Sequence, residues 1–497
     1  MPLESVGDYL LPDYLTDVRR VLHSSATVDR VNVFEGEEEL GIEGAVLIRA
    51  IYLDTEDKLS SLEFRTEIDT SLKWDKSVTE CSELTIAVEK LGLRLMGPRK
   101  FSARVGLCLL FDEAVVAVHS VDGDALNGRE PECDCIKVDM IEFKRQDYEK
   151  IAVSEQVEFI EGAIEDEISV LALDIAPVDL SVNGVGELKG QTEIRMLIRR
   201  GEEYPLYLTR TVPFEDSLPD MPKMGDHLRP VVEITDRESR IVADENGVRI
   251  EVSYTVNPRL LSYGNTRREL IRDCYLQELE THAEYGELDY LRLCGGLQGR
   301  ADVEIQKSAE ELGVGRIREA LYHAEEARCE EITVNDKYVH VVGKIRVSGI
   351  ACEINEENIP SYCSLKLDLP FDINVNNSCH IGDDSILECQ LSAQGCELYF
   401  DRESVRLSGK LDYSIVATEE QRSHVLTSLT IGDEPVVREE AVVTVYYPTS
   451  SESLFGIAKT FHTSVLKIAR DNSLTEEVFA DKSGSVLAHG VRKLIIR

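Results

Sequence analysis

The stretch GAVLIRAIYLDTEDKLSSLEFRTEID, at residues 44–69, decides the fold that the sequence predicts. It opens on a glycine, runs through an apolar segment, turns at the polar residues 54–57 and ends a second alternating segment at Asp69. Alternation of apolar and polar residues with a period of two is typical of strands that bury one face. The stretch therefore predicts an antiparallel hairpin.

Two later stretches repeat this order, GQTEIRMLIRRGEEYPLYLTRTVPFED at 190–216 and GKIRVSGIACEINEENIPSYCSLKLDLPFD at 343–372. A glycine opens each stretch and an acid ends it, as in the first. Proline before the end, at Pro213 and Pro370, removes a backbone donor and would stop the second strand. The recurrence predicts three copies of one β unit.

A second predicted hairpin follows each copy of the first. Its turns fall at Gly97-Pro98, at Asn246-Gly247 and near Asp401. Asn-Gly is a favoured dipeptide of tight hairpins. Two hairpins per copy favour antiparallel sandwiches or open barrels.

Helical spacing is expected between the β units. In LLPDYLTDVRRVL, at residues 10–22, Leu11, Leu15, Val18 and Leu22 would share one face of a helix. The segments 154–175 and 308–332 are predicted to be short helical or irregular connectors. A further strand pair is predicted within 272–293, and an exposed loop within 123–132.

In the last segment, residues 443–497, the spacing of apolar residues changes from that of strands to that of helices. In SLFGIAKTFHTSVLKIARDNSL, at 453–474, Leu454, Ile457, Ala458 and Phe461 line one face of a first helix, and Ile468 belongs to a second helix that Thr463 would cap. These five apolar residues are expected to hold a small core. Strand-like residues on both sides predict the order strand, helix, helix, strand.

The predicted fold is therefore mainly β, with three repeated antiparallel sandwich or barrel-like domains, short helical connectors and a small βααβ domain at the end. The expected domains are residues 1–142 (with an N-terminal helix), 143–295, 296–442 and 443–497.

Composition excludes several functions. The chain has 93 acidic and 54 basic residues and a net charge of −39, which repels phosphate backbones and argues against nucleic-acid binding. No apolar run approaches the roughly 18 residues of a membrane span. The N-terminal MPLESVGDYLL has no basic segment, so no signal peptide is expected. The twelve cysteines lack zinc-binding spacing and are expected to be free thiols in a cytosolic protein.

Motifs of catalysis are not found in the sequence. It has no phosphate-binding glycine loop, no GxSxG elbow, no HExxH pair and no DxDxDG calcium loop. No catalytic residue, metal ligand or cofactor is predicted, and the protein is not expected to be an enzyme.

Two resemblances to known protein families suggest a function for the chain. The tail resembles a LysM module, through SLFGIAKTFHTSVLKIARDNSL and the closing GVRKLIIR. The whole chain resembles the SipL family of spore-coat assembly proteins, built from repeated SPOCS domains and a C-terminal LysM module. The residues that carry this likeness are LLPDYLTDVRRVL, LEFRTEID, the GPRK turn, the repeated β unit and the tail.

The family resemblance implies a non-enzymatic scaffold in spore-forming Firmicutes. It implies a place in the mother-cell cytoplasm at the forespore surface, and partners that are a basal coat morphogenetic ATPase and other coat proteins. The LysM-like tail would dock the ATPase. Its candidate binding residues for a partner or a glycan are Ser451, Glu452, Ser453, Phe455, Lys459, Asp471 and Asn472. Glu452, Phe455, Lys459 and Asn472 are expected to be exposed.

Two other functions stay open at this point. The LysM likeness alone would make the chain a binder of peptidoglycan or of a lipid-linked glycan precursor. A β-rich hydrolase with an unrecognised site is a third reading, and a deep cleft lined by converging acids would favour it.

Overall fold

The computed structural model describes residues 2–35, 39–73, 84–111, 130–161, 163–201, 203–218, 222–243, 245, 247–354, 360–436, 443–449, 452–474 and 492–497. Almost all of the described chain is β structure, with two short α-helices near the C-terminus. The expectation of a mainly β protein with several antiparallel sheets is confirmed. No helix among the described residues is both long and apolar enough to cross a membrane.

The chain divides into two compact units. The first comprises Met1–Val115, Phe143–Gly264 and Cys294–Ala417, and the second comprises Val116–Glu142, Asn265–Leu293 and Thr418–Arg497.

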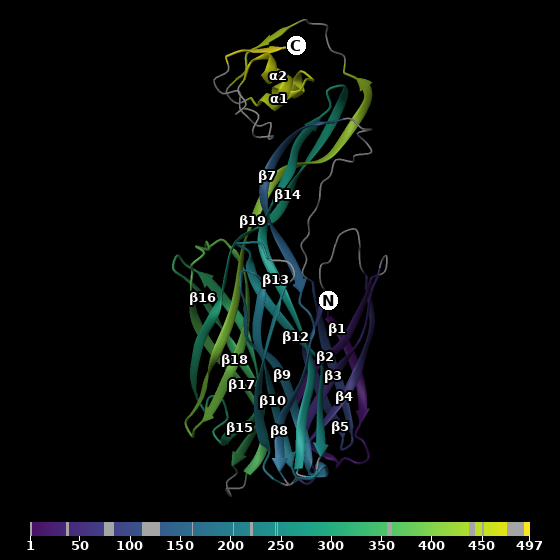
Figure 1. The fold of residues 1–497 in the computed structure, drawn as a ribbon, viewed down its shortest axis with the longest axis vertical. Helices are drawn as coiled ribbons and strands as arrows, with labels where there is room; N and C mark the ends of the chain where they lie inside the picture. Colours follow the sequence, from purple (N-terminus) through teal and green to yellow (C-terminus); the bar gives the residue numbers. More distant parts are fainter. Residues whose placement is uncertain are drawn as a thin grey trace. The chain divides into compact units, whose positions relative to one another are not determined.

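Six antiparallel sheets occur as three pairs, which Figure 1 shows as ribbons. The first pair consists of β2 (Val18–Glu35), β3 (Glu39–Asp54) and β4 (Leu59–Lys73) against β1 (Pro2–Leu10), β6 (Lys100–Phe111) and β5 (Leu84–Gly97). The second consists of β9 (Ile168–Val182), β10 (Glu187–Arg200) and β11 (Leu206–Ser217) against β12 (His227–Ala243), β13 (Gly247–Tyr275), β7 (Glu132–Asp147) and β8 (Ile151–Glu161). The third consists of β15 (Ile317–Val334), β16 (Tyr338–Ile354) and β17 (Pro360–Asn376) against β14 (Leu279–Ser308), β19 (Ser404–Pro435) and β18 (Ile386–Phe400).

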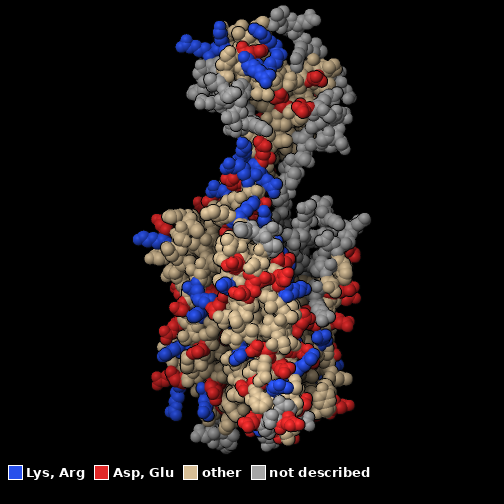
Figure 2. Space-filling model, in the orientation of Figure 1, with Lys and Arg blue, Asp and Glu red and all other residues tan. Residues whose placement is uncertain are grey.

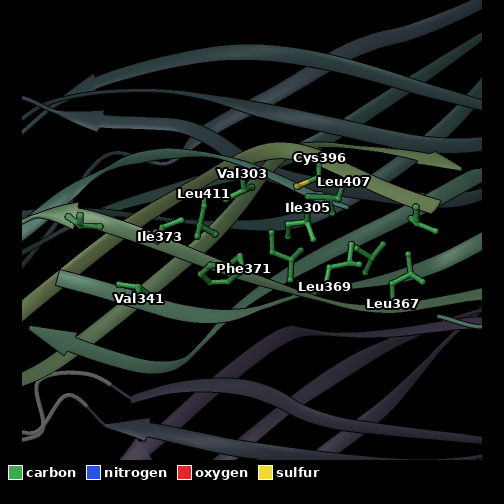
Figure 3. Packing of buried hydrophobic residues seen from close by; sticks show 14 of the residues in the cluster. Val303, Ile305, Val341, Leu367, Leu369, Phe371, Ile373, Cys396, Leu407 and Leu411 are labelled. Atoms are coloured by element: carbon green, nitrogen blue, oxygen red, sulfur yellow. The ribbon is translucent and has the colours of Figure 1, made fainter. Parts of the chain in front are cut away.

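Each sheet pair encloses its own hydrophobic core. In the third pair the inward residues of β17 alternate with exposed polar residues, as the sequence pattern predicts for a strand with one buried face. Figure 3 shows Leu369 and Phe371 across the core from Ile305 and Leu411, which come from the opposite sheet. These side chains are at most 7% exposed.

The three predicted first hairpins are confirmed as strand pairs, β3–β4, β10–β11 and β16–β17. The expectation that Pro213 and Pro370 stop the second strand is wrong, because β11 continues to Ser217 and β17 to Asn376. Their opening glycines occupy matched positions in the register, and the cross-strand pairs are Gly44 with Ile68, Gly190 with Phe214 and Gly343 with Phe371. The turn of the first hairpin is held by Asp54, whose carboxylate accepts hydrogen bonds from the backbone of Glu56 and Lys58 at 2.8 and 2.9 Å. Residues 202 and 355–359, at the other two turns, lie outside the described residues.

All three predicted second hairpins form strand pairs, and two of them turn at the predicted residues. Strands β5 and β6 meet at Gly97, which pairs with Lys100. Strands β18 and β19 meet at Asp401, whose N–H donates to the carbonyl of Ser404 at 3.0 Å. The pair β12–β13 turns between Ala243 and Gly247, although Asn246 itself lies outside the described residues.

Aromatic rings explain the glycine in the second and third hairpins. A Cβ atom at Gly190 would lie 2.7 Å from the ring of Phe214, and one at Gly343 would lie 2.6 Å from the ring of Phe371. At Gly343 it would also lie 2.1 Å from the backbone oxygen of Arg328, which cannot move away as a side chain can. The ring of each phenylalanine therefore covers a position where only glycine fits.

A central cluster joins the three sheet pairs within the first unit. Its buried members are Leu22, Ile51, Leu53, Leu59, Leu171, Ala172, Leu197, Leu321, Tyr322, Ile350 and Cys352. Ile51, Leu197 and Ile350 each lie seven residues after an opening glycine, and all three are fully buried. The middle strands of the three sheets, β3, β10 and β16, thus each place one of these side chains in a shared core.

The predicted N-terminal helix is wrong, because residues 18–22 begin strand β2. Bulges lie between Val18 and Arg20 and between Val21 and His23 in the pairing with β3. Each bulge adds a residue and changes the face that the next side chain occupies. Val18 and Leu22, which would share one face of a helix or of a regular strand, are both buried at 3% but in different cores. Val18 packs with Leu11 and Tyr52, whereas Leu22 belongs to the central cluster.

The helical connectors are also wrong. Residues 154–175 form β8, a single 3-10 turn η1 (Glu165–Glu167) and β9. Most of 308–332 is strand β15, which has three register shifts in its pairing with β16 and so again breaks the period of two. The segment 272–293 holds strand residues, the end of β13 and the first part of β14, but these strands belong to different sheets, so the predicted pair within the segment is wrong. The expected loop at 123–132 lies almost wholly outside the described residues.

Charged side chains cover the surface of the first unit. Figure 2 shows acidic and basic side chains interspersed on the face that it draws. Many of them pair across neighbouring strands at the surface, such as Arg346 with Asp368 at 3.1 Å. Exposed pairs of this kind contribute little to stability, about 0–1 kcal/mol each, so the buried cores must hold the fold.

We predict that Gly343→Ala destabilises the third sheet pair. The added methyl group would push against the ring of Phe371 and the carbonyl of Arg328, and overpacking of this kind costs about 1–3 kcal/mol. Gly382→Ala is the matched control, because no atom lies within 4 Å of its added Cβ. Urea denaturation should lower the unfolding midpoint of the first variant only. Equal midpoints for both variants would show that the close approach at Gly343 is absent.

Candidate functional site: the C-terminal helix pair and its anchor residues

The C-terminal tail, residues 443–497, has the predicted order of strand, two helices and strand. Its elements are β20 (Thr444–Tyr446), α1 (Leu454–Thr460), α2 (Val465–Asp471) and β21 (Leu494–Ile496). The two strands pair antiparallel, so that they join the beginning and the end of the tail. Residues 475–491, which include the long second loop, lie outside the described residues.

Serine side chains begin both helices. Ser453 accepts a hydrogen bond from the N–H of Gly456 at 3.0 Å, and Ser464 accepts one from the N–H of Lys467 at 3.1 Å. The prediction that Thr463 caps the second helix is wrong by one residue. Thr463 is instead 3% exposed; its N–H donates to the carbonyl of Ala458 at the end of α1, and its carbonyl accepts from the hydroxyl of Tyr275.

The predicted core of the tail is confirmed. Leu454, Ile457, Ala458 and Ile468 are at most 3% exposed, and Phe461 packs against them. The i, i+3, i+4 spacing therefore identified the inward face of α1 correctly.

Tyr275, at the end of β13, completes this core from outside the tail. Its ring meets the ring of Phe455 edge-on with centroids 5.2 Å apart, and its hydroxyl donates to the carbonyl of Thr463 at 2.6 Å. The side chain is 1% exposed, and burial raises the pKa of Tyr275 above its ordinary value. The phenol therefore stays neutral and remains a hydrogen-bond donor.

Asp273 makes the second link to the tail. Both of its carboxylate oxygens accept from the Nζ of Lys459 at 2.7 Å, and the hydroxyl of Tyr285 donates to one of them at 2.8 Å. Burial disfavours the charged ammonium of Lys459, but the hydrogen bonds and the charge of Asp273 outweigh this and raise its pKa. We call Asp273, Tyr275 and Tyr285 the anchor residues.

The predicted binding residues of the first loop are engaged within the tail. The carboxylate of Glu452 accepts from the Tyr446 hydroxyl and from the N–H of Thr449, both at 2.6 Å. The hydrogen bond from Tyr446 is the main reason that the pKa of Glu452 is lowered. Ser453 caps α1, and Ser451 lies outside the described residues.

The other predicted binding residues differ in their surroundings. Phe455 is only 4% exposed, so the expectation that it is exposed is wrong, because its ring packs on Tyr275. Lys459 is paired with Asp273, and Lys459, Glu452 and Asn472 are half-buried, so the expectation that they are exposed is also wrong. Asn472 ends α2 and exchanges hydrogen bonds with the backbone of Ile495 at 2.6 and 2.7 Å, which holds β21 in place. Asp471 is half-buried at the end of α2.

An apolar row on the tail was not predicted. Val445 lies in β20, Val443 directly precedes the strand and Tyr447 directly follows it, and the three are 52%, 47% and 71% exposed. Alternate residues of a strand share one face. The signal VTVYY was visible in the sequence, but which of its two faces would be covered depended on where the helices pack. Exposed apolar rows of this kind are typical of interaction surfaces.

A buried polar cluster lies in the first unit, beside the central cluster. Arg195 of β10 donates to Glu193 at 2.7 Å and to Glu325 of β15 at 2.6 Å, and Glu325 also contacts Nδ1 of His323 at 2.5 Å. The Arg195 and Glu325 side chains are 7% and 2% exposed. Burial raises the pKa of Glu325, but the hydrogen bond from His323 and the charge of Arg195 outweigh it and lower the pKa overall.

A cavity of about 450 Å³ borders this cluster. Glu193, Arg195, Tyr207, His323, Cys396 and Tyr399 are among its lining residues. The guanidinium at its wall is already neutralised by two carboxylates, and no separate nucleophile is positioned against His323 by the contacts that the structure shows. The ion pair between Arg195 and Glu325 links β10 to β15.

Neither a metal site nor a similar known protein identifies the function of this chain. No three His, Cys, Asp or Glu side chains in the described part of the chain are placed to hold a metal ion. Comparisons with protein-family models, with curated proteins and with solved structures found no match to this chain. The resemblance to the SipL family therefore stays a prediction.

We predict that Tyr275→Phe loosens the tail. The carbonyl of Thr463 would lose its donor, and an unpaired buried group of this kind costs about 1–3 kcal/mol. Hydrogen exchange of the α1 and α2 amides should report an opening free energy lowered by about that amount. Tyr447→Phe is the control, because that ring is largely exposed. Unchanged exchange in the first variant would mean that Tyr275 does not hold the tail.

We also predict a pH dependence at Glu325. Its pKa in the folded protein lies below the ordinary value of 4.5, so its stabilising effect is complete above that pH and is lost as the pH falls through the folded value. The difference in unfolding free energy between the native protein and Glu325→Gln should be largest above about pH 5 and should shrink in more acidic buffer.

Glu326→Gln provides the comparison for this measurement. Glu326 is the next residue and forms an exposed pair with Arg328, so its effect should be small at every pH. A difference for Glu325→Gln that stays constant from neutral to acidic pH would contradict the assigned ion pair.

Proposed function

We propose that this protein is a non-enzymatic scaffold of spore-coat assembly and forespore encasement, which docks to a basal coat morphogenetic ATPase through its LysM-like tail. Its place would be the mother-cell cytoplasm at the forespore and coat surface, and it would need no cofactor. The observation that carries the proposal is the exposed apolar row Val443, Val445 and Tyr447 on a tail whose core is completed by Tyr275.

The chemistry of the tail favours a protein partner over a glycan. The polar atoms of the first loop, at Glu452 and Ser453, are already used in internal hydrogen bonds. Sugar recognition needs polar groups that are free to bind hydroxyl and acetamido groups. An apolar row with an aromatic residue instead resembles the anchor of a protein interface.

The first unit supports the scaffold half of the proposal. We propose that its three sheet pairs are three copies of one SPOCS-like β-sandwich domain, at about residues 1–142, 143–295 and 296–442, followed by a LysM-like domain at 443–497. The matched glycine registers and the shared position of Ile51, Leu197 and Ile350 support the triplication. A joined core would hold the surfaces of three copies in a constant arrangement, which suits a protein that binds partners.

The docking test uses the full chain, because Tyr275 completes the core of the tail. We predict that Val445→Asp or Tyr447→Asp weakens binding to the coat-base ATPase by at least about tenfold, as the loss of an interface anchor does. Val185→Asp is the matched control, since Val185 is 49% exposed in the first unit and lies outside the tail. Binding is measured by titration with purified ATPase and compared with titration by soluble muropeptides.

The same variants locate the function in cells. A fluorescent fusion should form a ring around the forespore of a sporulating cell, and Tyr447→Asp should make the signal diffuse while Val185→Asp should not. Muropeptide binding without ATPase binding would replace the scaffold with the alternative function, recognition of peptidoglycan or of a lipid-linked glycan precursor. Diffuse signal for the native fusion would count against a coat role.

A further inference from the structure

We propose that Cys133 and Cys274 form a redox-sensitive dithiol, which closes to a disulfide and thereby locks the anchor residues of the tail in place. Neither residue has a part in the docking role proposed above. The inference rests on the second unit alone, which contains both cysteines and the tail.

The two thiols already touch. Their Sγ atoms are 3.5 Å apart, within the distance of a sulfur hydrogen bond. Cys133 lies near the start of β7 and Cys274 near the end of β13, and these strands are neighbours in one sheet. A disulfide needs its two sulfurs to approach to about 2.0 Å, which is a small movement from the present contact.

The strand register supports the pairing of these two cysteines over others. On one side of the pair Gln277 donates to Glu132 at 2.9 Å, and on the other Arg272 donates to Asp134 at 2.7 Å. Farther along, Arg267 contacts Asp139. The residue number falls on one strand as it rises on the other, as in an antiparallel pair, so Cys133 and Cys274 are held opposite each other from both sides.

The two sulfurs differ in access and in chemistry. Cys274 is fully buried, whereas Cys133 is half-buried and so can meet a small oxidant. The hydrogen bond between the two thiols lowers the pKa of Cys133 and raises that of Cys274. The thiolate is the reactive form of cysteine, so Cys133 is the first site of oxidation.

The reaction balances with hydrogen peroxide as the oxidant. The Cys133 thiolate attacks one peroxide oxygen, the O–O bond breaks, and protonation of the departing hydroxide gives water and a sulfenic acid on Cys133. The Cys274 sulfur, losing its proton, attacks the sulfenic sulfur and forms the S–S bond, and the hydroxyl leaves as a second water. Two thiols and one peroxide thus give one disulfide and two waters.

A disulfide at Cys274 would affect the tail, because the residues on both sides of Cys274 contact it. Its neighbours on β13 are Asp273, which holds Lys459, and Tyr275, which packs on Phe455 and donates to Thr463. A covalent bond from Cys274 to β7 would restrict the strand segment that carries both contacts. Oxidation is therefore expected to slow the opening of the tail, and reduction to restore it.

A third cysteine on the same strand is an internal control. Cys135 lies two residues from Cys133, on the same face of β7, and burial raises the pKa of its thiol to about 11. It should therefore react slowly. The sulfur–sulfur hydrogen bond that the structure shows in this part of the chain joins Cys133 to Cys274 and does not involve Cys135. Cys135→Ser should leave the reaction intact.

The test begins with the native full-length protein. It is treated with hydrogen peroxide, the remaining thiols are alkylated, and the disulfide-linked peptides are mapped by mass spectrometry. We expect the main linkage to join Cys133 to Cys274, to form in Cys135→Ser and to fail in Cys133→Ser. A main linkage through Cys135, or equal oxidation in all variants, would overturn the proposal.

A second measurement tests the effect on the tail. Hydrogen exchange of the amides in 454–471 should slow by about tenfold or more on oxidation and recover with dithiothreitol, in the native protein and in Cys135→Ser only. Unchanged exchange on formation of the mapped disulfide would overturn the proposed lock. Tight zinc binding by the reduced protein, lost in Cys133→Ser, would show a metal site instead and would also overturn it. A failure of ATPase docking would leave both readouts unaffected, so the two proposals fail separately.

Discussion

Leu197 has no exposed surface, and it lies where the side chains of three sheet pairs meet in the central cluster. This shared burial constrains the rest of the first unit. A sheet pair alone would leave Ile51, Leu197 or Ile350 facing water, at a cost of about 1.5–3 kcal/mol for each large aliphatic side chain. Close approach of the strands here also demands small residues. At Gly349, for example, a Cβ atom would lie 1.9 Å from the carbonyl oxygen of Tyr322.

The buried cluster of Arg195, Glu193 and Glu325 complements this apolar contact. Hydrophobic burial has no direction, so it holds β10 near β15 without choosing how the two strands align. An ion pair with hydrogen bonds in fixed directions distinguishes one alignment from its neighbours. Removing one member would leave an uncompensated buried charge, which costs about 3–5 kcal/mol. We interpret the cluster as a device for specificity, which explains why charged groups are kept beside a core.

The tail shows the same combination of an apolar contact and a directed polar one. Phe455 packs on Tyr275, and Lys459 binds both carboxylate oxygens of Asp273. Its core is therefore not complete within residues 443–497. This explains why the aromatic residue that the sequence presented as an exposed contact is buried, and why the free apolar surface is found instead on β20.

The sequence by itself determined the β class, the hairpin pairs, the order of elements in the tail and the inward face of α1. These features depend on local periodicity, turn chemistry and capping, which neighbouring residues settle among themselves. It misled where bulges broke the period of two, as in residues 18–22, where Val18 and Leu22 have the spacing of one helix face but are buried in different cores. Only the tertiary structure decided which side chains of the candidate site are free. Glu452, Phe455 and Lys459 look alike as surface residues in the sequence, and their partners, Tyr446, Tyr275 and Asp273, are chosen by packing. The contact of Cys133 with Cys274 arises in the same way, because strand pairing brings together residues that are far apart along the chain.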